Sequence, residues 1–349
     1  MKKLLTLITL TALLFSCSQD ESSDAEIVDF IVTETSSTDL IVKDIIIDSE
    51  LNKIYVFFDN DLSQMNASIT LTADIKLSSG AKASSVVSSE LSFANADEVK
   101  TIEVTAENGS TKNWYIYLIH HQLQNSGFGQ WFDNQGMNGK DYKEIGSSAG
   151  KSVWSTANMA TSIYDVHCTK PLADGTNTLV EITTGKTSQV PVTAGTIFLG
   201  TFDLAGAIAH PTEPEQATIF GVPFIFRPTG VKFKYKYQAG DTLIQATLNN
   251  PTNIFGGFTV EDIDGEDKCS MYAILESRNG DQVSEIAYTK IESGTTDDVM
   301  IETTMTFDYS STATPTHITV VFSSSTAGHE WRGAVGSKLV IDDVELVYE

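Results

Sequence analysis

Lys232-Phe233-Lys234-Tyr235-Lys236-Tyr237 is the stretch that decides the fold class, because its residues alternate strictly between lysine and an aromatic residue. Successive side chains of a β-strand point to opposite faces of the sheet, so this stretch has one aromatic face and one lysine face. A strand with one buried and one solvated face is typical of an antiparallel sheet. The stretch therefore predicts an antiparallel strand whose rings lie against a core.

The strand pattern continues on both sides of this stretch. Short runs rich in Val, Ile, Thr, Phe and Tyr are separated by Gly, Asn, Asp and Ser, and helical periodicity is nearly absent. Strands are predicted at residues 179–183, 196–203, 230–237, 270–276, 300–308, 316–323 and 337–348. Their number and the size of the region predict an all-β jelly roll over residues 128–349.

A second group of strands is predicted nearer the start of the chain. They lie at residues 41–47, 53–58, 68–71, 99–106 and 114–119. Apolar residues are nearly continuous from Lys53 to Phe58, so both faces of that strand are expected to be covered. Asn108-Gly109 is a strong hairpin signal, because both residues tolerate positive φ. This hairpin resembles the closing hairpin of bacterial immunoglobulin-like modules, which usually act as spacers.

The domain organisation follows from these two groups of strands. The resemblance implies an immunoglobulin-like β-sandwich over residues 27–121. Residues 122–127 are polar and are expected to be the linker to the jelly roll.

The first seventeen residues resemble a bacterial lipoprotein signal peptide. Lys2 and Lys3 precede an apolar run, which is too short to cross a bilayer as a helix and ends in a lipobox-like sequence at Cys17. Cys17 would then carry the acyl chains, and the polar, acidic residues 18–26 would form a tether. We expect a lipid-anchored outer-membrane protein at the cell surface. A location on the periplasmic face and a plain secretory signal with a chance cysteine are the alternatives.

The charge of the chain excludes one class of partner. The formal net charge is −24, and removal of Lys2 and Lys3 with the signal peptide would make it −26. Nucleic-acid binding needs clusters of lysine and arginine, which are absent from this sequence. A neutral ligand such as a sugar is compatible with the acidic chain. The acyl chains are the only membrane contact that we expect.

Two cysteines remain after the signal region, Cys168 and Cys269. They could form a disulfide in an oxidising compartment, or they could be two buried thiols that pack as small apolar residues. The sequence leaves both alternatives open.

A set of local sequences in the jelly-roll region resembles one known family. In chain order these sequences are 154–158 (WSTAN), 194–200 (AGTIFLG), 221–224 (GVPF), 227–229 (RPT), 235–237 (YKY) and 333–344 (GAVGSKLVIDDV). Together they are similar to the putative carbohydrate metabolism domain of Bacteroides-type surface lipoproteins. The resemblance implies a jelly roll similar to galactose-binding-like modules, often preceded by an immunoglobulin-like domain. It does not place catalytic residues on this sequence.

Sugar-binding sites stack an aromatic ring on the sugar and bond its hydroxyls with polar side chains. Two places in the sequence offer that combination. Trp154 is followed closely by Asn158, and the loop-like stretch His329-Glu330-Trp331-Arg332 joins a ring to three polar groups. We predict carbohydrate contacts at both places and favour the second. The alternative for each tryptophan is a core or rim anchor, and Trp131 is expected in the core.

Calcium is the one cofactor that the sequence suggests. Asp342 lies an even number of positions from several apolar residues of the last strand. In a regular strand, this carboxylate would therefore point inward with them. A buried carboxylate must be paired, hydrogen-bonded or bound to a cation. Jelly rolls similar to galactose-binding modules often hold a structural calcium near the chain ends, so Asp342 is a candidate ligand. The acidic run 262–267 also suggests calcium, but we expect it to be a solvated hairpin tip.

Catalysis has no clear signal in the sequence. Gly146-Ser147-Ser148-Ala149-Gly150 matches a nucleophile elbow but lacks the strand and helix that this motif requires. A glycoside hydrolase needs two carboxylates, and the sequence cannot select a pair among 46 acidic residues. We therefore favour non-catalytic binding of an extracellular glycan. The alternatives are a glycoside hydrolase and a structural adhesin with a protein partner of unknown identity.

Overall fold

The computed structural model describes residues 21–348, except 63, 64, 66, 67, 84–87 and 281. Strands make up 51% of the chain and helices 7%, so the all-β prediction is confirmed. The signal peptide, Cys17 and the first residues of the tether lie outside the described residues. Within the described part, no helix is long and apolar enough to cross a membrane.

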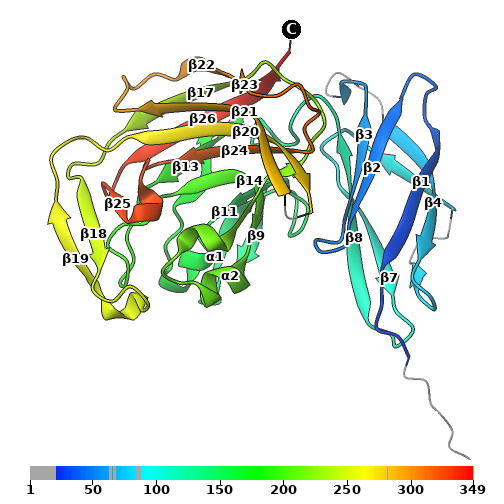
Figure 1. Cartoon of the computed structure of the whole chain (residues 1–349), viewed down its shortest axis with the longest axis horizontal. Coiled ribbons are helices and arrows are strands. Elements are labelled where there is room, and N and C mark those ends of the chain that lie inside the picture. Colours follow the sequence, from blue (N-terminus) through cyan, green and yellow to red (C-terminus); the bar gives the residue numbers. More distant parts are fainter. Residues whose placement is uncertain (1–20, 63–64, 66–67, 84–87, 281, 349) are drawn as a thin grey trace, which may run out of the picture.

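The N-terminal domain consists of two packed sheets (Figure 1). One contains β1 (Ile27–Thr35), β4 (Ile69–Leu77) and β6 (Ser88–Phe93). The other, in spatial order, contains β2 (Val42–Asp48), β3 (Lys53–Phe58), β8 (Thr111–Ile119), β7 (Lys100–Thr105) and β5 (Lys82–Ala83). β3 and β8 are parallel, and the other pairs in this domain are antiparallel.

All six residues of β3 are buried, as the sequence predicted. Ile54, Val56 and Phe58 belong to the core of the N-terminal domain. Tyr55 and Phe57 point the other way and belong to the core that the two domains share. The continuous apolar run is therefore explained by a strand that lies between two cores.

The second domain is a sandwich of two larger antiparallel sheets. The first contains β12 (Thr169–Asp174), β13 (Asn177–Thr183), β26 (Lys338–Val347), β17 (Gly230–Gln238) and β22 (Ile301–Thr306). The path of the second runs through β11 (Trp154–Thr156), β14 (Thr196–Phe202), β24 (His317–Ser323), β20 (Cys269–Asn279), β21 (Gln282–Ser293) and β23 (Asp308–Tyr309). Beside that path, β15 (Thr218–Phe220) pairs with β14 and β16 (Val222–Pro223) pairs with β24.

Smaller elements surround this sandwich. Two are hairpins, formed by β9 (Trp131–Gln135) with β10 (Asp141–Ile145) and by β18 (Ile244–Leu248) with β19 (Phe258–Asp262). The short strand β25 (Arg332–Gly333) pairs with β18. The helical turns are α1 (Asn158–Thr161), η2 (Ser162–Tyr164), α2 (Leu204–Ala209), η3 (Pro214–Ala217), η4 (Ile254–Gly256) and η5 (Gly328–Glu330).

The alternating stretch in β17 behaves as predicted. Its aromatic side chains, such as Phe233 and Tyr235, are buried in the core between the sheets. Its lysines lie on the outer face, where Lys232 pairs with Glu345 at 2.5 Å. Neighbouring lysines along β17 make equivalent ion pairs. The aromatic side chains thus anchor the strand in the core. The lysine side chains lie on the solvated face, where neighbouring carboxylates balance their charges.

The predicted orientation of Asp342 is wrong, because β26 contains a β-bulge. Asp343 has a φ of 50°, and the pairing of β17 with β26 shifts register between Lys232 and Lys234. The extra residue reverses the alternation of side chains. Ile341 and Val344 therefore both enter the core, although they lie an odd number of positions apart. Asp342 lies opposite Lys234 on the outer face of the sheet.

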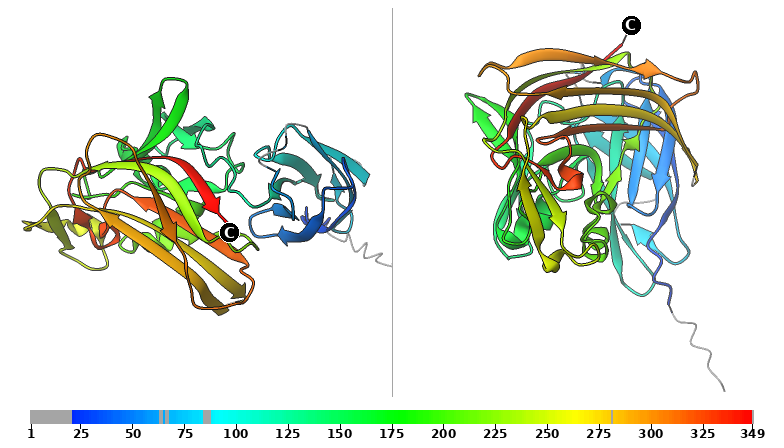
Figure 2. Two further views of the ribbon diagram at one scale, coloured as in Figure 1. Left: turned by 90° about the horizontal axis from the view of Figure 1, so that it is seen from above. Right: turned by 60° about the vertical axis from the view of Figure 1, so that its left-hand side comes forward.

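The segment expected as a linker is packed between the domains. The side-chain amide of Gln122 forms two hydrogen bonds with the backbone of Leu346, donating from Nε2 to the carbonyl oxygen and accepting from the backbone N–H at Oε1, both at 2.8 Å. Leu123 and Gln124 are buried. Figure 2 shows from above that the C-terminus also lies between the two domains. Residues 122–127 therefore connect the domains in chain order without acting as a solvated tether.

The two cysteines are free and buried. Burial raises the pKa of the Cys168 thiol to about 11 and that of Cys269 to about 12. Of the two alternatives that the sequence left open, the structure shows the protonated, packed thiols.

Candidate functional site

Trp154 is a core residue, so its prediction as a sugar contact is wrong. Its side chain is 1% exposed, and its ring packs against Phe128 and Phe322. The indole N–H donates to the carbonyl oxygen of Gln124 at 2.9 Å. Because neighbouring rings cover the indole and its polar atom is bonded, Trp154 anchors the inter-domain segment and cannot stack on a ligand in this structure.

Asn158 is also structural. It is 1% exposed at the start of α1, and its amide bonds the backbone of Thr169 in both directions. The side-chain N–H₂ donates to the carbonyl oxygen at 2.6 Å, and the side-chain oxygen accepts from the backbone N–H at 3.1 Å. Asn158 therefore holds α1 against β12 and is not a ligand contact in this structure.

The other predicted contacts lie together on the surface, in a loop between β24 and β26. We call residues 324–337 the Trp331 loop. His329, Glu330 and Arg332 are exposed, and Trp331 is partly exposed between them. Trp331 has a φ of 58°, a left-handed conformation that is uncommon for a bulky residue. Such a conformation persists only where the surroundings impose it, and it often marks a functional position.

The Trp331 loop is held by the β18–β19 hairpin. The backbone N–H of Ala246 donates to the carbonyl oxygen of Trp331 at 3.0 Å, and the Gln245 amide donates to that of Glu330 at 2.8 Å. The rings of Trp331 and Phe258 meet edge to face with centroids 5.4 Å apart. Phe255, at the tip of the hairpin, is 71% exposed. The hairpin and the loop thus form one aromatic projection from the jelly roll.

The second sheet presents further aromatic residues on its outer face. Met271 and Ala273 of β20 point into the core, so Tyr272 points outward. Tyr272 lies opposite Lys290 of β21. Tyr288, two residues before Lys290 on β21, lies opposite the outward residue of β20 that follows Tyr272. Tyr288 is 36% exposed. We did not predict these tyrosines as site residues, although the alternation of residues 270–276 already separates Tyr272 from the apolar core positions.

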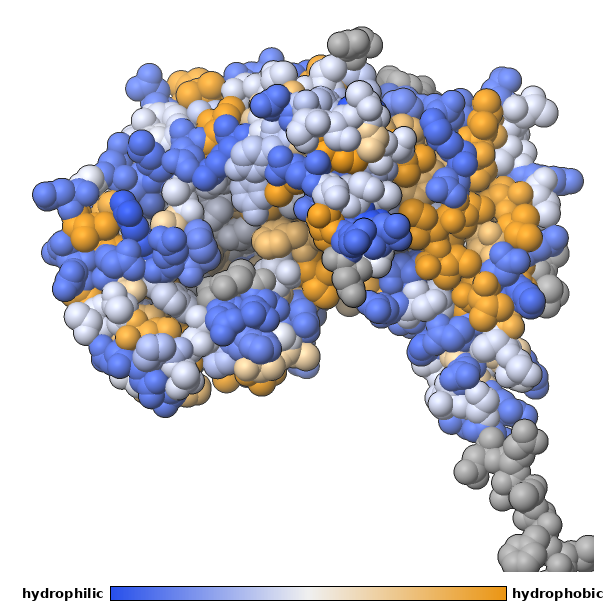
Figure 3. All heavy atoms as spheres, in the orientation of Figure 1, coloured by the Kyte–Doolittle hydropathy of each residue, from blue (hydrophilic) through white to orange (hydrophobic). Residues whose placement is uncertain are grey.

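A hollow lies on the face of the molecule shown in Figure 3, between the part that carries β18 and β19 and the part that carries α1 and α2. The same view of the ribbon shows β20 and β24 passing above this region, and β25, which belongs to the Trp331 loop, beside β18 at its edge (Figure 1). The Trp331 loop therefore stands at one end of a concave surface. A ring beside a hollow with neighbouring polar side chains is the arrangement that favours a sugar ligand.

Glu144 on β10 is a carboxyl group with a strongly altered proton affinity. Burial raises its pKa to about 7, although hydrogen bonds partly offset this effect. Both of its carboxyl oxygens lie 3.0 Å from the Thr156 hydroxyl on β11. Tyr142 adds a further hydrogen bond. A carboxyl group with this pKa can hold or release a proton near neutral pH.

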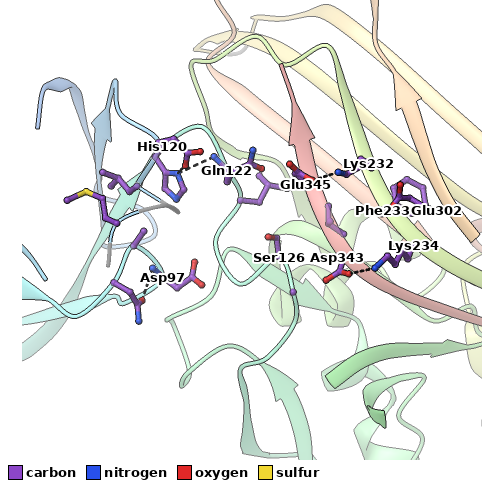
Figure 4. Close-up of a pocket in the computed structure, with 18 residues that line it drawn as sticks. Asp97, His120, Gln122, Ser126, Lys232, Phe233, Lys234, Glu302, Asp343 and Glu345 are labelled. Atoms are coloured by element: carbon purple, nitrogen blue, oxygen red, sulfur yellow. Dashed lines mark hydrogen bonds and ion pairs between the residues drawn. The ribbon is translucent and has the colours of Figure 1, made fainter. Parts of the chain in front are cut away.

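A polar pocket of about 540 Å³ lies between the domains (Figure 4). The lysine face of β17 forms one wall, where Lys232 and Lys234 are paired with Glu345 and Asp343. The N-terminal domain forms the other wall. Phe233 also lines the pocket, but it is fully buried and presents no ring face. The lysine charges are therefore already neutralised, and we do not assign the glycan to this pocket.

Neither candidate calcium position has the surroundings of a metal site in the described part of the chain. There, no group of three His, Cys, Asp or Glu side chains could hold a metal ion. Asp342 accepts a hydrogen bond from Asn177 at 2.7 Å, while its Oδ1 is buried without a partner. Burial raises the pKa of Asp342. Calcium binding at Asp342 stays a prediction: the carboxylate is 5% exposed, as the prediction requires, but it lies on the outer face of the sheet and not in the core.

The acidic run 262–267 is only partly the solvated tip that we expected. Asp262 and Asp264 are exposed, but Asp267 is 5% exposed and accepts hydrogen bonds from hydroxyl and backbone N–H groups. A carboxylate oxygen that faces several donors is occupied as a hydrogen-bond acceptor. Asp267 is thus a structural residue of the fold.

Comparison with solved structures shows the same fold in two proteins from Bacteroides species. One, named as a putative glycoside hydrolase from Bacteroides thetaiotaomicron, is 23% identical, covers 95% of this chain and 98% of its own, and superimposes with a TM-score of 0.55. The other, a putative glycoside hydrolase from Bacteroides vulgatus, is 22% identical, covers 64% and 97%, and has a TM-score of 0.53. No curated protein matches the chain.

The sequence also matches a family model described as "Putative carbohydrate metabolism domain" over residues 103–347. The match starts inside β7 of the N-terminal domain and ends at the last residue of β26. It thus includes the last strands of the N-terminal domain, the packed inter-domain segment and the whole sandwich. The resemblance found in the sequence is confirmed, and the chain belongs to the putative carbohydrate metabolism domain family.

Proposed function

We propose that this protein is a lipid-anchored surface protein that binds an extracellular glycan without cleaving it. The observation that carries the proposal is the aromatic projection formed by Trp331 and Phe258. The part of the chain that carries this projection, with β18 and β19, borders the hollow (Figure 3). Three exposed polar side chains, His329, Glu330 and Arg332, surround the tryptophan and offer both donors and acceptors to sugar hydroxyls. The family assignment supports a carbohydrate as the ligand.

A printed glycan array tests this proposal. Fluorescently labelled protein that lacks residues 1–17 should bind a limited set of related glycans. Binding to no glycan at millimolar ligand would contradict the proposal. Binding that is equally strong to all spots and is lost at moderate salt would indicate non-specific charge effects instead.

Hydrolysis of the same glycan is the second candidate function, and Glu144 is the observation that favours it. A carboxyl group with a pKa of about 7 has the proton affinity that a general acid needs. The two similar Bacteroides proteins are named as putative glycoside hydrolases. A glycosidase also needs a second carboxylate at about 5 to 9 Å. Release of reducing ends from an array-positive glycan, lost in Glu144→Gln, would establish this function in place of simple binding.

The lipid anchor is tested separately. Cys17→Ser should prevent acylation and move the protein from the membrane fraction to the soluble fraction, since the acyl chains are the proposed membrane contact. Protease treatment of intact cells then distinguishes the cell surface from the periplasmic face. An unchanged membrane fraction in Cys17→Ser would contradict the anchor.

A further inference from the structure

The Trp331 loop is tied together by one buried carboxylate at its base. The Oδ2 atom of Asp267 accepts hydrogen bonds from the Ser325 hydroxyl at 2.6 Å, the Ala334 backbone N–H at 2.8 Å and the Ser337 hydroxyl at 2.7 Å. Its Oδ1 atom accepts from the backbone N–H of Lys268 at 2.9 Å. Ser325 precedes Trp331 in the chain, and the other two loop donors follow it. A single oxygen therefore fixes both ends of the loop.

The donors that bond Asp267 are themselves buried and connected. Ser325 is 2% exposed, and Ser337 is fully buried. The Thr184 hydroxyl lies 2.6 Å from that of Ser325 and 2.8 Å from that of Ser324. This hydroxyl cluster connects the base of the loop to the segment that follows β13. Because hydrogen bonds to a buried charged group are stronger than neutral ones, the carboxylate is the centre of the cluster.

The tip of the loop depends on this base. Trp331 keeps a left-handed backbone conformation that its own side chain disfavours. At the tip, the backbone of the loop is bonded to β18 through Ala246 and Gln245. These contacts can hold the tip only if the two ends of the loop arrive at fixed positions. Asp267 sets those positions from the opposite end of the loop.

We propose that Asp267 is a positioning residue for glycan binding, which holds the Trp331 loop so that the indole ring stands beside the hollow. This inference rests on the proposed function for its biological meaning. It predicts that the affinity for glycan depends on a carboxylate that the ligand never touches. A preorganised ring binds more tightly than a mobile one, because less conformational entropy is lost on binding.

Asp267→Asn tests the inference, with Asp264→Asn as its matched control. Both changes remove one negative charge from the same acidic run, but Asp264 is exposed. In Asp267→Asn, an amide N–H₂ replaces an acceptor oxygen, and the loop donors lose their charged partner. We expect the half-saturating protein concentration on the glycan array to rise about tenfold, while the control stays at the wild-type value. Wild-type binding by Asp267→Asn would overturn the proposal.

A spectroscopic measurement separates positioning from general stability. Acrylamide quenching of Trp331 fluorescence, isolated by subtraction of a Trp331→Phe variant, should roughly double in Asp267→Asn at a temperature where circular dichroism shows the protein folded. In a Trp331→Ala background, Asp267→Asn should cause no further loss of affinity, because both changes remove the same interaction. Additive losses would show that Asp267 acts only on stability and would overturn the proposal.

The inference can still be tested if the variant does not fold or if the wild-type protein binds no glycan. Should Asp267→Asn fail to fold, Ser337→Ala removes one of the three loop donors and must still increase the quenching of Trp331. Should the wild-type protein bind no glycan, the proposed function fails. The quenching comparison then still decides whether Asp267 positions the ring, and unchanged quenching in both variants would refute it.

Discussion

At the residue scale, buried carboxyl groups give this acidic protein its specific chemistry. Asp267 and Asp342 are buried and Glu144 is partly buried, and each meets a different set of partners. Glu144 meets two hydroxyl groups and a backbone N–H, Asp267 meets three donors at one oxygen, and Asp342 keeps one oxygen without a partner. Because the cost of burying a carboxylate depends on those partners, the three groups should respond differently to neutralisation.

Glu144 should make the stability depend on pH. Its pKa is about 7 in the folded protein, against an ordinary value of 4.5. The folded state therefore binds a proton that the unfolded chain has released, and the free energy of unfolding should fall as pH rises from about 4.5 to about 7, by on the order of 3 kcal/mol. Glu144→Gln should remove this dependence in urea unfolding at several pH values. Asp141→Asn, an exposed change on the same strand, should leave it in place.

Asp342→Asn should be neutral or stabilising at pH 7. The variant keeps an oxygen that can accept from Asn177 and removes a buried charge with an unpartnered oxygen. The change in melting temperature measures this. The calcium prediction is checked in the same experiment, because calcium added after chelation should raise the melting temperature of the wild type but not of Asp342→Asn. A wild type that is indifferent to calcium removes Asp342 as a ligand.

At the element scale, the sequence predicted strands well where the alternation was unbroken. The lysine and aromatic alternation of β17 and the continuous apolar run of β3 both had the burial expected. The prediction of side-chain directions in β26 was wrong, because the strand contains a bulge with a positive φ at Asp343. The surrounding sheet imposes this conformation on the aspartate. The prediction of Trp154 as a sugar contact was wrong, because the rings that cover its indole come from distant segments of the chain. In both failures the deciding information was tertiary and not local.

The bulge itself can be tested with a matched pair of glycine substitutions. Asp343 and Glu345 lie on the same strand, and each pairs with one partly exposed lysine of β17. Glycine removes the ion pair in both cases, but it relieves the positive φ only at Asp343. Asp343→Gly should therefore be more stable than Glu345→Gly by about 1 kcal/mol in urea unfolding. Equal losses would mean that the left-handed conformation costs nothing.

At the scale of the whole molecule, the two domains form a continuous structure. One hydrophobic core includes Tyr55 and Tyr117 from the N-terminal domain together with strands of both jelly-roll sheets. The Tyr117 hydroxyl donates to the carbonyl oxygen of Gly150 at 2.5 Å. The polar composition of residues 122–127 suggested a linker, but it cannot show that a side-chain amide will pair with a backbone more than two hundred residues away. The N-terminal domain is thus a fixed support for the sandwich.

Gln122→Ala should weaken this junction. It removes two hydrogen bonds and leaves the Leu346 backbone groups without their partner, at a cost of about 2 kcal/mol. We expect earlier proteolytic cleavage within residues 122–127 and a broader thermal transition, as the domains begin to unfold separately. Gln135→Ala, an exposed change on β9, should show neither effect. Identical cleavage of both variants would contradict a fixed junction.

The ring of Trp331 is the proposed contact with glycan, and the proposed function depends on it more than on any other residue. Isothermal titration of an array-positive glycan into Trp331→Ala tests this directly, with Ile31→Ala as the control, because Ile31 is an exposed apolar residue of the N-terminal domain. We predict that Trp331→Ala loses at least about tenfold in affinity, that Ile31→Ala keeps the wild-type value, and that the glycan is recovered intact. Undiminished affinity in Trp331→Ala would contradict the account.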